Sequence, residues 1–379
     1  MKSQAFLHLR DWLFEDAFPL WSTTGLDLVH GGFIELLDGS GAVLPRPLRA
    51  RLVGRQIYAF SIAARLGWAG PAREVVRHGL DYLLSEVVRD GKVTPLSPRD
   101  GTAAVEGFDL YDQAFVLFGM AAAASLGEAT QELSHVARGI LAEMRSGYSH
   151  PFAGFEESRP RTLPLKANPH MHMLEASLAW CEVSDSDGVW DALADEIVGL
   201  CLTHFLDPKT GALREYFDGD WRLIDGDAHD VVEPGHQSEW AWLLIRWGLR
   251  KQRPDAVAAG RRLIEIAENH GVSAQDLAVN ELGPDLSVRS DLHRLWPQTE
   301  RIKAFVALGW VATDEAERQH ARHKMEAAAK GLLRYTHCPV RGGWWEHLDA
   351  SGQPLDEPIR ASSLYHITCA VMEMTRATP

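Results

Sequence analysis

The feature that most constrains the fold is a regular succession of amphipathic helical segments along a chain of 379 residues. Apolar residues recur at the spacing of an α-helix over most of its length. We expect helices at residues 4–21, 51–66, 71–88, 110–126, 130–146, 171–183, 189–205, 236–251, 255–270, 297–312, 315–335 and 359–376. No region shows the alternating strand and helix pattern of a parallel α/β sheet, so the sequence predicts an all-α protein.

Longer connections rich in Gly and Asp separate alternate helices and repeat one pattern. His30–Glu35 followed by Leu37–Gly41 resembles Arg341–Glu346 followed by Leu348–Gly352, and fainter copies occur at residues 153–156 and 211–220. Each copy predicts a short β-hairpin whose turn consists of Asp, Gly and Ser. The pattern recurs about every sixty residues, a scale that is typical of closed or stacked arrays.

Pairing successive helices predicts a six-hairpin (α/α)6 barrel, in which an inner ring of helices lies inside an outer ring. An open α-solenoid is the alternative. Connections of one recurring kind would gather as short β-hairpins at one mouth of a barrel, which favours the closed form. No Pro- or Ser-rich linker divides the chain, so we expect residues 1–379 to form one domain.

Composition argues against several classes of partner. The chain has 38 basic and 52 acidic residues, a formal charge of −14, which disfavours nucleic acid and anionic membranes as partners. The N-terminus lacks a signal-peptide core, and no apolar stretch is long enough to cross a bilayer. Four scattered cysteines without a CxxC motif predict reduced thiols and a cytoplasmic protein. The 13 tryptophans and 17 histidines suit a site that stacks on a small polar ligand and exchanges protons with it.

The stretch Val232–Trp242 carries the clearest chemical signal. A Pro-Gly break precedes an apolar run and places His236 where a helix should begin. Glu239, three residues later, should share its helix face. The stretch Asn168–Glu175 repeats this spacing with His172 and Glu175. These helix starts predict one polar site with a base of near-neutral pKa and carboxylates.

Further candidates lie at the starts of other predicted helices. Trp296 and Glu300 again place an aromatic ring and a carboxylate at a helix start, and His366 lies on the last helix. Arg55 alone would be expected to form a salt bridge. Tyr111 and Asp112 fit equally well with packing or with a wall that contacts substrate.

A metal site is the less favoured interpretation of these histidines. His170 and His172 form a His-x-His pair, but residues two apart lie about 200° apart around a helix and cannot share a ligand set. Neither an HExxH motif nor a zinc-type Cys/His array occurs. We therefore expect no metal and assign His170 a structural role.

Several motifs together resemble the N-acylglucosamine 2-epimerase superfamily, which also contains cellobiose 2-epimerase, D-mannose isomerase and sulfoquinovose isomerase. The resemblance runs nearly end to end. It is carried by Gly54-Arg55-Gln56, Tyr111-Asp112-Gln113-Ala114-Phe115, Asn168-Pro169-His170-Met171-His172-Met173-Leu174-Glu175-Ala176, Glu233-Pro234-Gly235-His236 with Glu239-Trp240, Trp296-Pro297-Gln298-Thr299-Glu300, and Tyr365-His366. Arg51-Leu52-Val53 departs from the Trp-Leu-Gln run of many epimerases, whereas Pro297–Glu300 and the short hairpins look most like the mannose isomerase branch.

The resemblance implies metal-free and cofactor-free sugar chemistry on an (α/α)6 barrel. It implies that His172, His236 and His366 are the site histidines and that Arg55 lies beside them. The residues expected to contact substrate are Asn168, Glu175, Glu239, Trp296, Glu300, Tyr111 and Asp112.

The residues fit an isomerase that interconverts an unphosphorylated aldose and ketose of the mannose/fructose type through a cis-enediolate. A histidine can move the proton next to the carbonyl, and Arg55 can stabilise the charge on oxygen. We choose His366 for the carbon and His236 for the oxygen chemistry. A sugar 2-epimerase is the first alternative, and a glycoside hydrolase or a non-catalytic sugar-binding protein is the second. A free monosaccharide is the expected partner, and the oligomeric state is left open, with a homodimer as one option.

Overall fold

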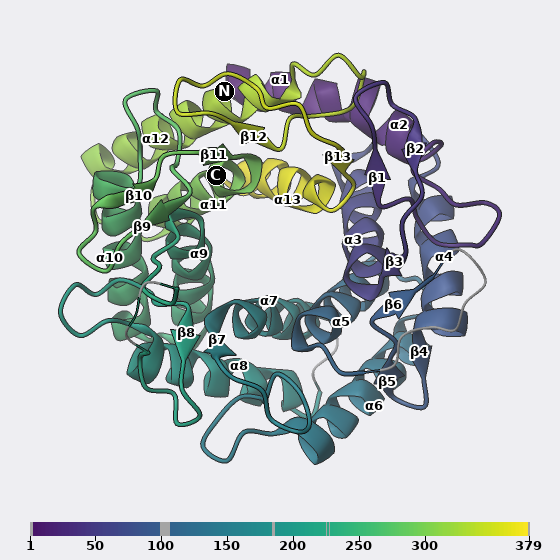
Figure 1. Cartoon of the computed structure of the whole chain (residues 1–379), viewed down its shortest axis with the longest axis horizontal. Coiled ribbons are helices and arrows are strands. Elements are labelled where there is room, and N and C mark those ends of the chain that lie inside the picture. Colours follow the sequence, from purple (N-terminus) through teal and green to yellow (C-terminus); the bar gives the residue numbers. More distant parts are fainter. Residues whose placement is uncertain (1–2, 99–106, 184–185, 225, 227, 378–379) are drawn as a thin grey trace.

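The computed structural model describes residues 3–98, 107–183, 186–224, 226 and 228–377. These residues form two concentric rings of helices (Figure 1). The inner ring consists of α3 (Ala50–Leu66), α5 (Leu110–Ala124), α7 (Ala167–Val183), α9 (Pro234–Lys251), α11 (Leu295–Trp310) and α13 (Ser363–Arg376). The outer ring consists of α1 (Gln4–Trp12), which continues through a π-helical turn into α2 (Phe18–Trp21), and of α4 (Ala72–Tyr82), α6 (Thr130–Tyr148), α8 (Val189–Leu200), α10 (Pro254–His270) and α12 (Glu315–Leu333). The predicted all-α (α/α)6 barrel is confirmed.

Burial explains the difference between the two rings. Every residue of α5 except Tyr111 is buried, as expected for a helix that is covered on all sides. The inner helices also approach one another closely. A Cβ on Gly54 of α3 would lie 2.0 Å from the carbonyl oxygen of Phe115 in α5, so only glycine fits there. Outer helices such as α10 bury one face only.

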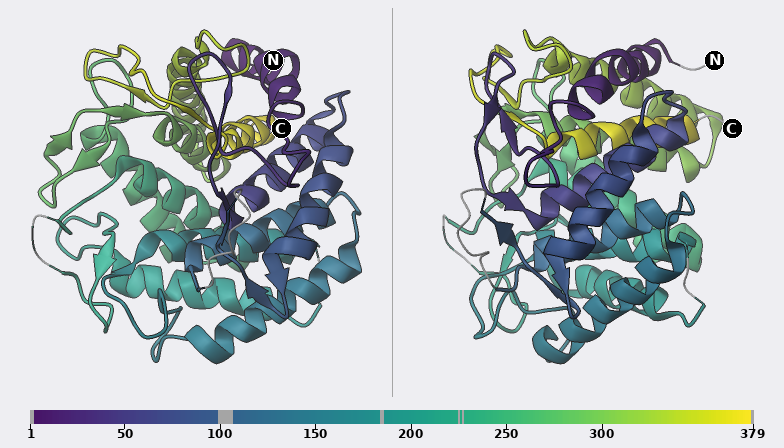
Figure 2. Two further views of the ribbon diagram at one scale, coloured as in Figure 1. Left: turned by 45° about the vertical axis from the view of Figure 1, so that its right-hand side comes forward. Right: turned by 90° about the vertical axis from the view of Figure 1, so that its right-hand side faces the viewer.

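Short strands gather at one end of the barrel (Figure 2). Several pairs join the strand that precedes an inner helix to a neighbouring connection. The pairs are β1 (Leu36–Leu37) with β13 (Ile359–Arg360), β3 (Leu48–Arg49) with β6 (Leu96–Ser97), β7 (Leu165–Lys166) with β8 (Tyr216–Phe217), and β11 (His293–Arg294) with β12 (His347–Leu348). Others are β1 with β2 (Val43–Leu44), β4 (Val88–Arg89) with β5 (Lys92–Val93), and β9 (Glu281–Leu282) with β10 (Val288–Ser290). These pairs fix the direction in which the inner helices begin.

The expected turn chemistry is present in the two clearest repeats. Asp38 Oδ1 accepts hydrogen bonds from the backbone and hydroxyl of Ser40, at 2.8 and 2.7 Å. Asp349 Oδ1 accepts the same two bonds from Ser351, at 2.9 and 2.7 Å. Such Asp side chains replace backbone contacts in a tight turn. The repeat seen in the sequence is therefore a repeat of structure.

Prolines explain where the predicted helix boundaries are wrong. α7, α9 and α11 begin two to four residues earlier than expected, because Pro169, Pro234 and Pro297 lie in their first turns. A proline is tolerated there, since the first backbone amides of a helix have no partner within it. The last helix begins at Ser363, later than expected, because Ile359 and Arg360 form β13. Within the described part of the chain, helices with the length and apolarity needed to cross a membrane are absent.

Candidate functional site

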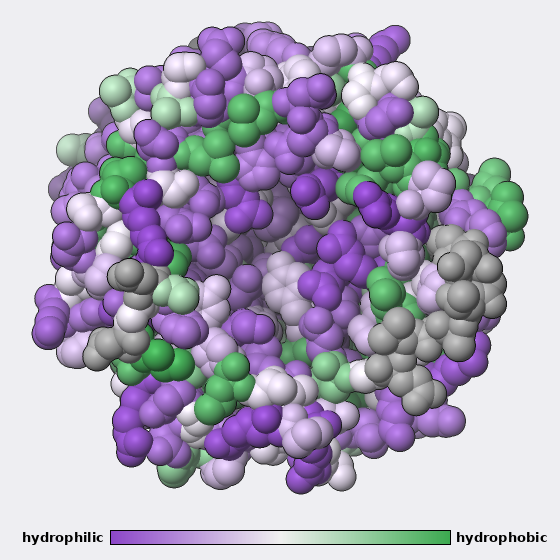
Figure 3. All heavy atoms as spheres, viewed as in Figure 1, coloured by the Kyte–Doolittle hydropathy of each residue, from purple (hydrophilic) through white to green (hydrophobic). Residues whose placement is uncertain are grey.

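The inner helices begin at the mouth that carries the strands, and polar side chains near these helix starts converge inside the barrel. Figure 3 shows this mouth hollowed at its centre, with mainly hydrophilic residues around the hollow. The side chains that meet here include Arg55 from α3, His172 from α7, His236 from α9 and His366 from α13. All four are buried.

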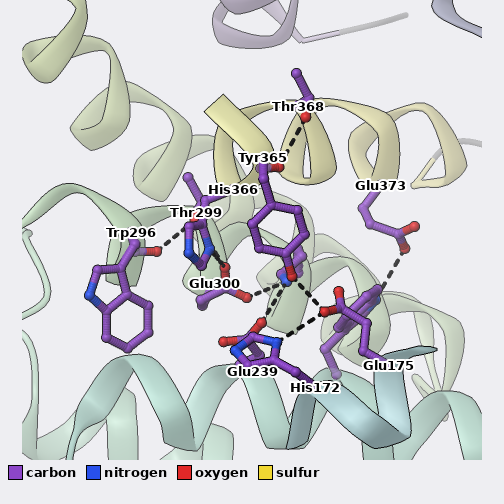
Figure 4. A network of polar contacts seen from close by, with 12 residues as sticks. His172, Glu175, Glu239, Trp296, Thr299, Glu300, Tyr365, His366, Thr368 and Glu373 are labelled. Atoms are coloured by element: carbon purple, nitrogen blue, oxygen red, sulfur yellow. Dashed lines mark hydrogen bonds and ion pairs between the residues drawn. The ribbon is translucent and has the colours of Figure 1, made fainter. Parts of the chain in front are cut away.

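His366 has one ring nitrogen committed to a carboxylate (Figure 4). Its Nδ1 lies 3.0 Å from Oε1 of Glu300, which also accepts a hydrogen bond from the Thr299 hydroxyl at 3.0 Å. Nδ1–H therefore donates to the carboxylate, and Nε2 is the nitrogen left to accept a proton. Burial, with the nearby charges of Arg55 and Lys303, holds the pKa of His366 well below its usual value. His366 is a neutral base.

His236 lies in the opposite electrostatic environment. Its Nδ1 is 2.9 Å from Oε1 of Glu215 and 3.8 Å from Oε2 of Glu233. Burial lowers the pKa of His236, but Glu215 and Glu233 more than offset this effect and raise the pKa to about 10. At neutral pH His236 is an imidazolium that can donate a proton.

Trp296 lies beside both histidines. The centroid of its ring system is 4.9 Å from that of His236 and 5.9 Å from that of His366. A Cβ on Gly235 would lie 2.4 Å from the indole, so the residue next to His236 must be small. An indole between an acid and a base can position a sugar ring by its apolar face.

His172 is held by the carboxylate that the sequence predicted. Its Nδ1 lies 3.2 Å from Oε2 of Glu175, which accepts a hydrogen bond from the hydroxyl of Tyr365 at 2.6 Å. Burial lowers the pKa of His172 to about 3. His172 is therefore neutral and presents Nε2 as a hydrogen-bonding group.

Arg55 is a cation that makes no ion pair with any of the described residues. Its Nη2 donates to the hydroxyl of Tyr111 at 2.7 Å, and its guanidinium lies 4.0 Å from the ring centroid of Phe115. Its Nε is buried without a hydrogen-bond partner. The salt-bridge interpretation of Arg55 is thus wrong, and the guanidinium keeps donors for an oxygen of a ligand.

Asp112 is the candidate that lies apart from this group. Both of its carboxylate oxygens bind Arg51, through Nε at 2.8 Å and Nη2 at 3.2 Å. The side chain is fully buried, so of the two interpretations weighed for Asp112, packing fits and substrate contact does not. His170 is structural, as expected: Nε2 accepts from the amide of Phe155 at 3.0 Å and Nδ1 donates to the carbonyl of Lys166 at 2.9 Å.

Two charged groups of the site were missed by the sequence analysis. Lys303 on α11 is fully buried, with Nζ 3.3 Å from Oε1 of Glu239, in an ion pair with Glu300, and 4.1 Å from the ring centroid of Trp242. Glu215, the partner of His236, lies in the connection before α9. The spacing of Lys303 from Glu300 was an available signal, whereas the contact of Glu215 depends on tertiary structure.

Several buried polar atoms at these helix starts have no hydrogen-bond partner among the described residues. They include Oε1 of Glu175, Oε2 of Glu239, Nε of Arg55 and Oδ1 of Asn168. An unmade buried hydrogen bond costs about 1–3 kcal/mol. A ligand with several hydroxyl groups would satisfy such atoms.

Three groups of side chains bring possible metal ligands within 4.8 Å of one another. They are His172, Glu175 and Glu239; Glu239, Glu300 and His366; and Glu215, Glu233 and His236. Spacing along one helix does not predict these groups, because each draws on more than one segment of the chain. In the second group, the ammonium of Lys303 already forms ion pairs with Glu239 and Glu300 and offsets one of their two charges. The third group contains no lysine, but His236 is protonated at neutral pH and would have to lose a proton to bind a divalent cation.

Comparison with known proteins gives a consistent result. A family model described as N-acylglucosamine 2-epimerase matches residues 31–370. A protein of Rhizobium meliloti named mannose-6-phosphate isomerase is 41% identical over 97% of this chain and 95% of its own length. Cellobiose 2-epimerase of Bacteroides fragilis is 21% identical over 88% of both chains. A crystal structure of D-mannose isomerase has a TM-score of 0.86 at 20% identity and covers 98% of each chain, which shows a shared fold.

Proposed function

Because the chain belongs to the N-acylglucosamine 2-epimerase family, whose members are carbohydrate isomerases and epimerases, we propose that it is an aldose–ketose isomerase. The proposed substrate is a free, unphosphorylated hexose of the mannose/fructose type, and the proposed reaction needs no metal or other cofactor. The four cysteines are free thiols, in keeping with the cytoplasm as the proposed location.

The observation that carries this proposal is that two histidines in opposite protonation states lie beside one indole. His366 is neutral with Nε2 available, whereas His236 is an imidazolium. Moving a hydrogen between two carbons of a sugar requires a base at carbon and proton donors at oxygen. Trp296 lies within 6 Å of both rings, close enough to support a sugar between them.

The proposed reaction begins with ring opening. His236 donates a proton to the ring oxygen and takes up the proton of the O1 hydroxyl as the bond between C1 and the ring oxygen breaks, which gives the open-chain aldose. Nε2 of His366 then removes the proton from C2, and the electrons of that C–H bond form the enediolate. Arg55 stabilises the negative charge that develops on oxygen. His236 donates a proton to O1 and takes up the proton of the O2 hydroxyl while His366 returns its proton to C1, which gives the ketose.

The charges near the mouth favour an uncharged sugar. Arg49 and Lys166 pair with Glu35 and Glu157, at 2.6 and 3.6 Å. Arg294 lies 5.5 Å from the ring centroid of Trp296 and makes no ion pair within the described ranges. A phosphate dianion beside Arg294 would also lie near the carboxylates of Glu215 and Glu233, the partners of His236, which would repel it. Since the 41% identical relative is named for a 6-phosphate, both forms of the sugar are to be assayed together.

A sugar 2-epimerase is the second candidate, and the same two histidines favour it. A neutral base on one face of C2 and an imidazolium on the other would invert that carbon, if His236 reached carbon and not oxygen. A glycoside hydrolase fits less well. It needs two carboxylates that act across the scissile bond, whereas Glu239 and Glu300 are both bound to Lys303.

The experiment is incubation with mannose, glucose, fructose or mannose 6-phosphate in heavy water, followed by proton NMR. We expect mannose and fructose to interconvert, with solvent deuterium incorporated at the exchanging carbon. Conversion of mannose to glucose would support the epimerase, and turnover of the phosphate ester alone would replace the substrate proposed. Binding of sugar without exchange would leave only the non-catalytic sugar-binding protein.

A further inference from the structure

We propose that Lys303 is a positioning residue: it keeps Glu300 ionised as the acceptor of Nδ1–H of His366, and so keeps Nε2 of His366 free of a proton. This inference rests on the proposed role of His366 as the base. It adds a residue that neither the sequence analysis nor the comparisons assign.

The geometry places Lys303 directly behind the base. Nζ forms an ion pair with Glu300, whose other oxygen lies 3.0 Å from Nδ1 of His366. The side chains of Lys303 and Glu300 are both 0% exposed, so no bulk water solvates either charge. Glu239 holds the ammonium from the side at 3.3 Å, and the face of Trp242 lies 4.1 Å from it. Figure 4 shows Glu300 beside His366, with Glu239 lying between Glu300 and His172.

The charges around Glu300 make the ammonium of Lys303 necessary to keep this carboxylate ionised. The groups that influence Lys303, Glu300 or His366 are the carboxylates Glu175 and Glu239, the cations Arg55 and Arg294, His172, and the thiol of Cys369. Burial and the charge of Glu239 hold the pKa of Glu300 well above its usual value, and Lys303 is the group that opposes them, since its ammonium forms an ion pair with this carboxylate. Without Lys303, Glu300 would take up a proton.

A protonated Glu300 would change the tautomer of His366. A carboxylic acid at this distance donates its proton to Nδ1, and the proton of a neutral imidazole must then reside on Nε2. Nε2 is the atom that accepts the proton from carbon, so the base would be lost although its position had not changed. Lys303 thus acts through Glu300 and need not touch the sugar.

Stability alone does not explain this ion pair. Replacing a buried ion pair by apolar side chains of similar volume is often neutral or stabilising. A buried lysine between two carboxylates is therefore not needed to hold α9 against α11. Lys303 contacts Glu300, the hydrogen-bond partner of His366, and this contact gives the ion pair a role in the reaction.

The test is Lys303→Met, with Arg301→Met as the matched control. Arg301 is a buried cation on the same helix, but it pairs with Glu268 on the outer helix α10 at 3.0 Å. In protein labelled with nitrogen-15 histidine, the signal of His366 is assigned by its absence in His366→Asn. We expect the Nδ1–H tautomer in the wild type and in Arg301→Met, and the Nε2–H tautomer in Lys303→Met. An unchanged tautomer in folded Lys303→Met would overturn the proposal.

This measurement needs no substrate, so it distinguishes failure of the proposal from failure of the proposed function. If no sugar is turned over by the wild type, the function is wrong, and the tautomer still decides the role of Lys303. With an active wild type, we expect Lys303→Met to lower kcat by roughly 10²-fold and Arg301→Met by less than about threefold. The acid limb of the pH profile of kcat should move to higher pH in Lys303→Met only, since Glu300 then loses its proton at higher pH.

A double variant keeps the test decisive if Lys303→Met does not fold. Glu300→Gln with Lys303→Met removes the two charges together and leaves no unpaired ammonium. Because Lys303 acts through Glu300, we expect kcat of this double variant to equal that of Glu300→Gln within about threefold. A further drop of about tenfold or more would show that Lys303 acts independently of Glu300 and would overturn the proposal.

Discussion

Replacing Arg55 by methionine is expected to reduce turnover much more than stability. In the free protein the guanidinium makes one hydrogen bond, to the Tyr111 hydroxyl at 2.7 Å, and packs on Phe115 at 4.0 Å. The hydrogen bond is worth about 1 kcal/mol and the cation–π contact about 1–2 kcal/mol. Methionine retains part of the packing, so we expect unfolding to become easier by about 1–2 kcal/mol. In the transition state, a donor to the developing oxyanion contributes roughly 10²–10³ in rate, or about 2.7–4 kcal/mol.

Arg51→Met is the matched control, because Arg51 lies one helical turn before Arg55 on α3. Arg51 binds Asp112, whose side chain is fully buried, at 2.8 Å. Loss of one partner of a buried pair costs about 3–5 kcal/mol, and the partial exposure of Arg51 favours the lower value. We expect this variant to lose more stability than Arg55→Met while turnover falls by less than about tenfold.

Chemical denaturation measures the two stabilities, and proton NMR of mannose solutions measures the two rates. We expect opposite orders for the two variants: Arg55→Met is the slower enzyme and Arg51→Met is the less stable protein. Turnover of folded Arg55→Met within a few-fold of the wild type would show that the guanidinium does not stabilise the enediolate.

Three further predictions concern protonation, metal and folding. The pKa of His236, raised from 6.5 to about 10, means that its charge stabilises the fold fully below pH 6.5 and that this contribution is lost as the pH rises through 10. Because Glu215 raises this pKa, Glu215→Gln should move the alkaline limb of the pH profile of kcat to lower pH. An unchanged alkaline limb would show that the titration of His236 does not cause it. Dialysis against a chelator should leave activity intact, because the ammonium of Lys303 already provides a positive charge between Glu239 and Glu300. A full loss of activity that zinc or manganese restores would point to a metal ion bound by Glu215, Glu233 and His236. Thermal unfolding should show one cooperative transition for the barrel, whereas two separated transitions would indicate two folding units.

The helical pattern and the turns were sufficient to predict the barrel, because periodicity reports burial directly. The predicted helix boundaries were wrong at prolines, because a proline can either interrupt the chain or occupy the first turn of a helix. Pro169, Pro234 and Pro297 look like breaks in the chain, yet each lies in the first turn of an inner helix. Only the position of the neighbouring strands distinguishes a proline that ends a connection from one that begins a helix.

The site was predictable wherever partners lie on one helix. His172 and Glu175 have the expected spacing and the expected contact. For His236 the same spacing indicated Glu239, but the partner is Glu215, which lies 21 residues earlier in a connection. Lys303 would be solvated on an outer helix. On an inner helix it must be paired, and its burial follows from the architecture and not from its neighbours in sequence.

The central claim is that Nε2 of His366 moves the proton at carbon while His236 serves the oxygen chemistry. The direct measurement is exchange of the C2 proton of mannose in heavy water, by proton NMR, with His366→Asn and His236→Asn. We expect His366→Asn to lose exchange altogether. His236→Asn should retain slow exchange on sugar that has opened spontaneously. Exchange near the wild-type rate in His366→Asn would contradict the assignment and reverse the two roles.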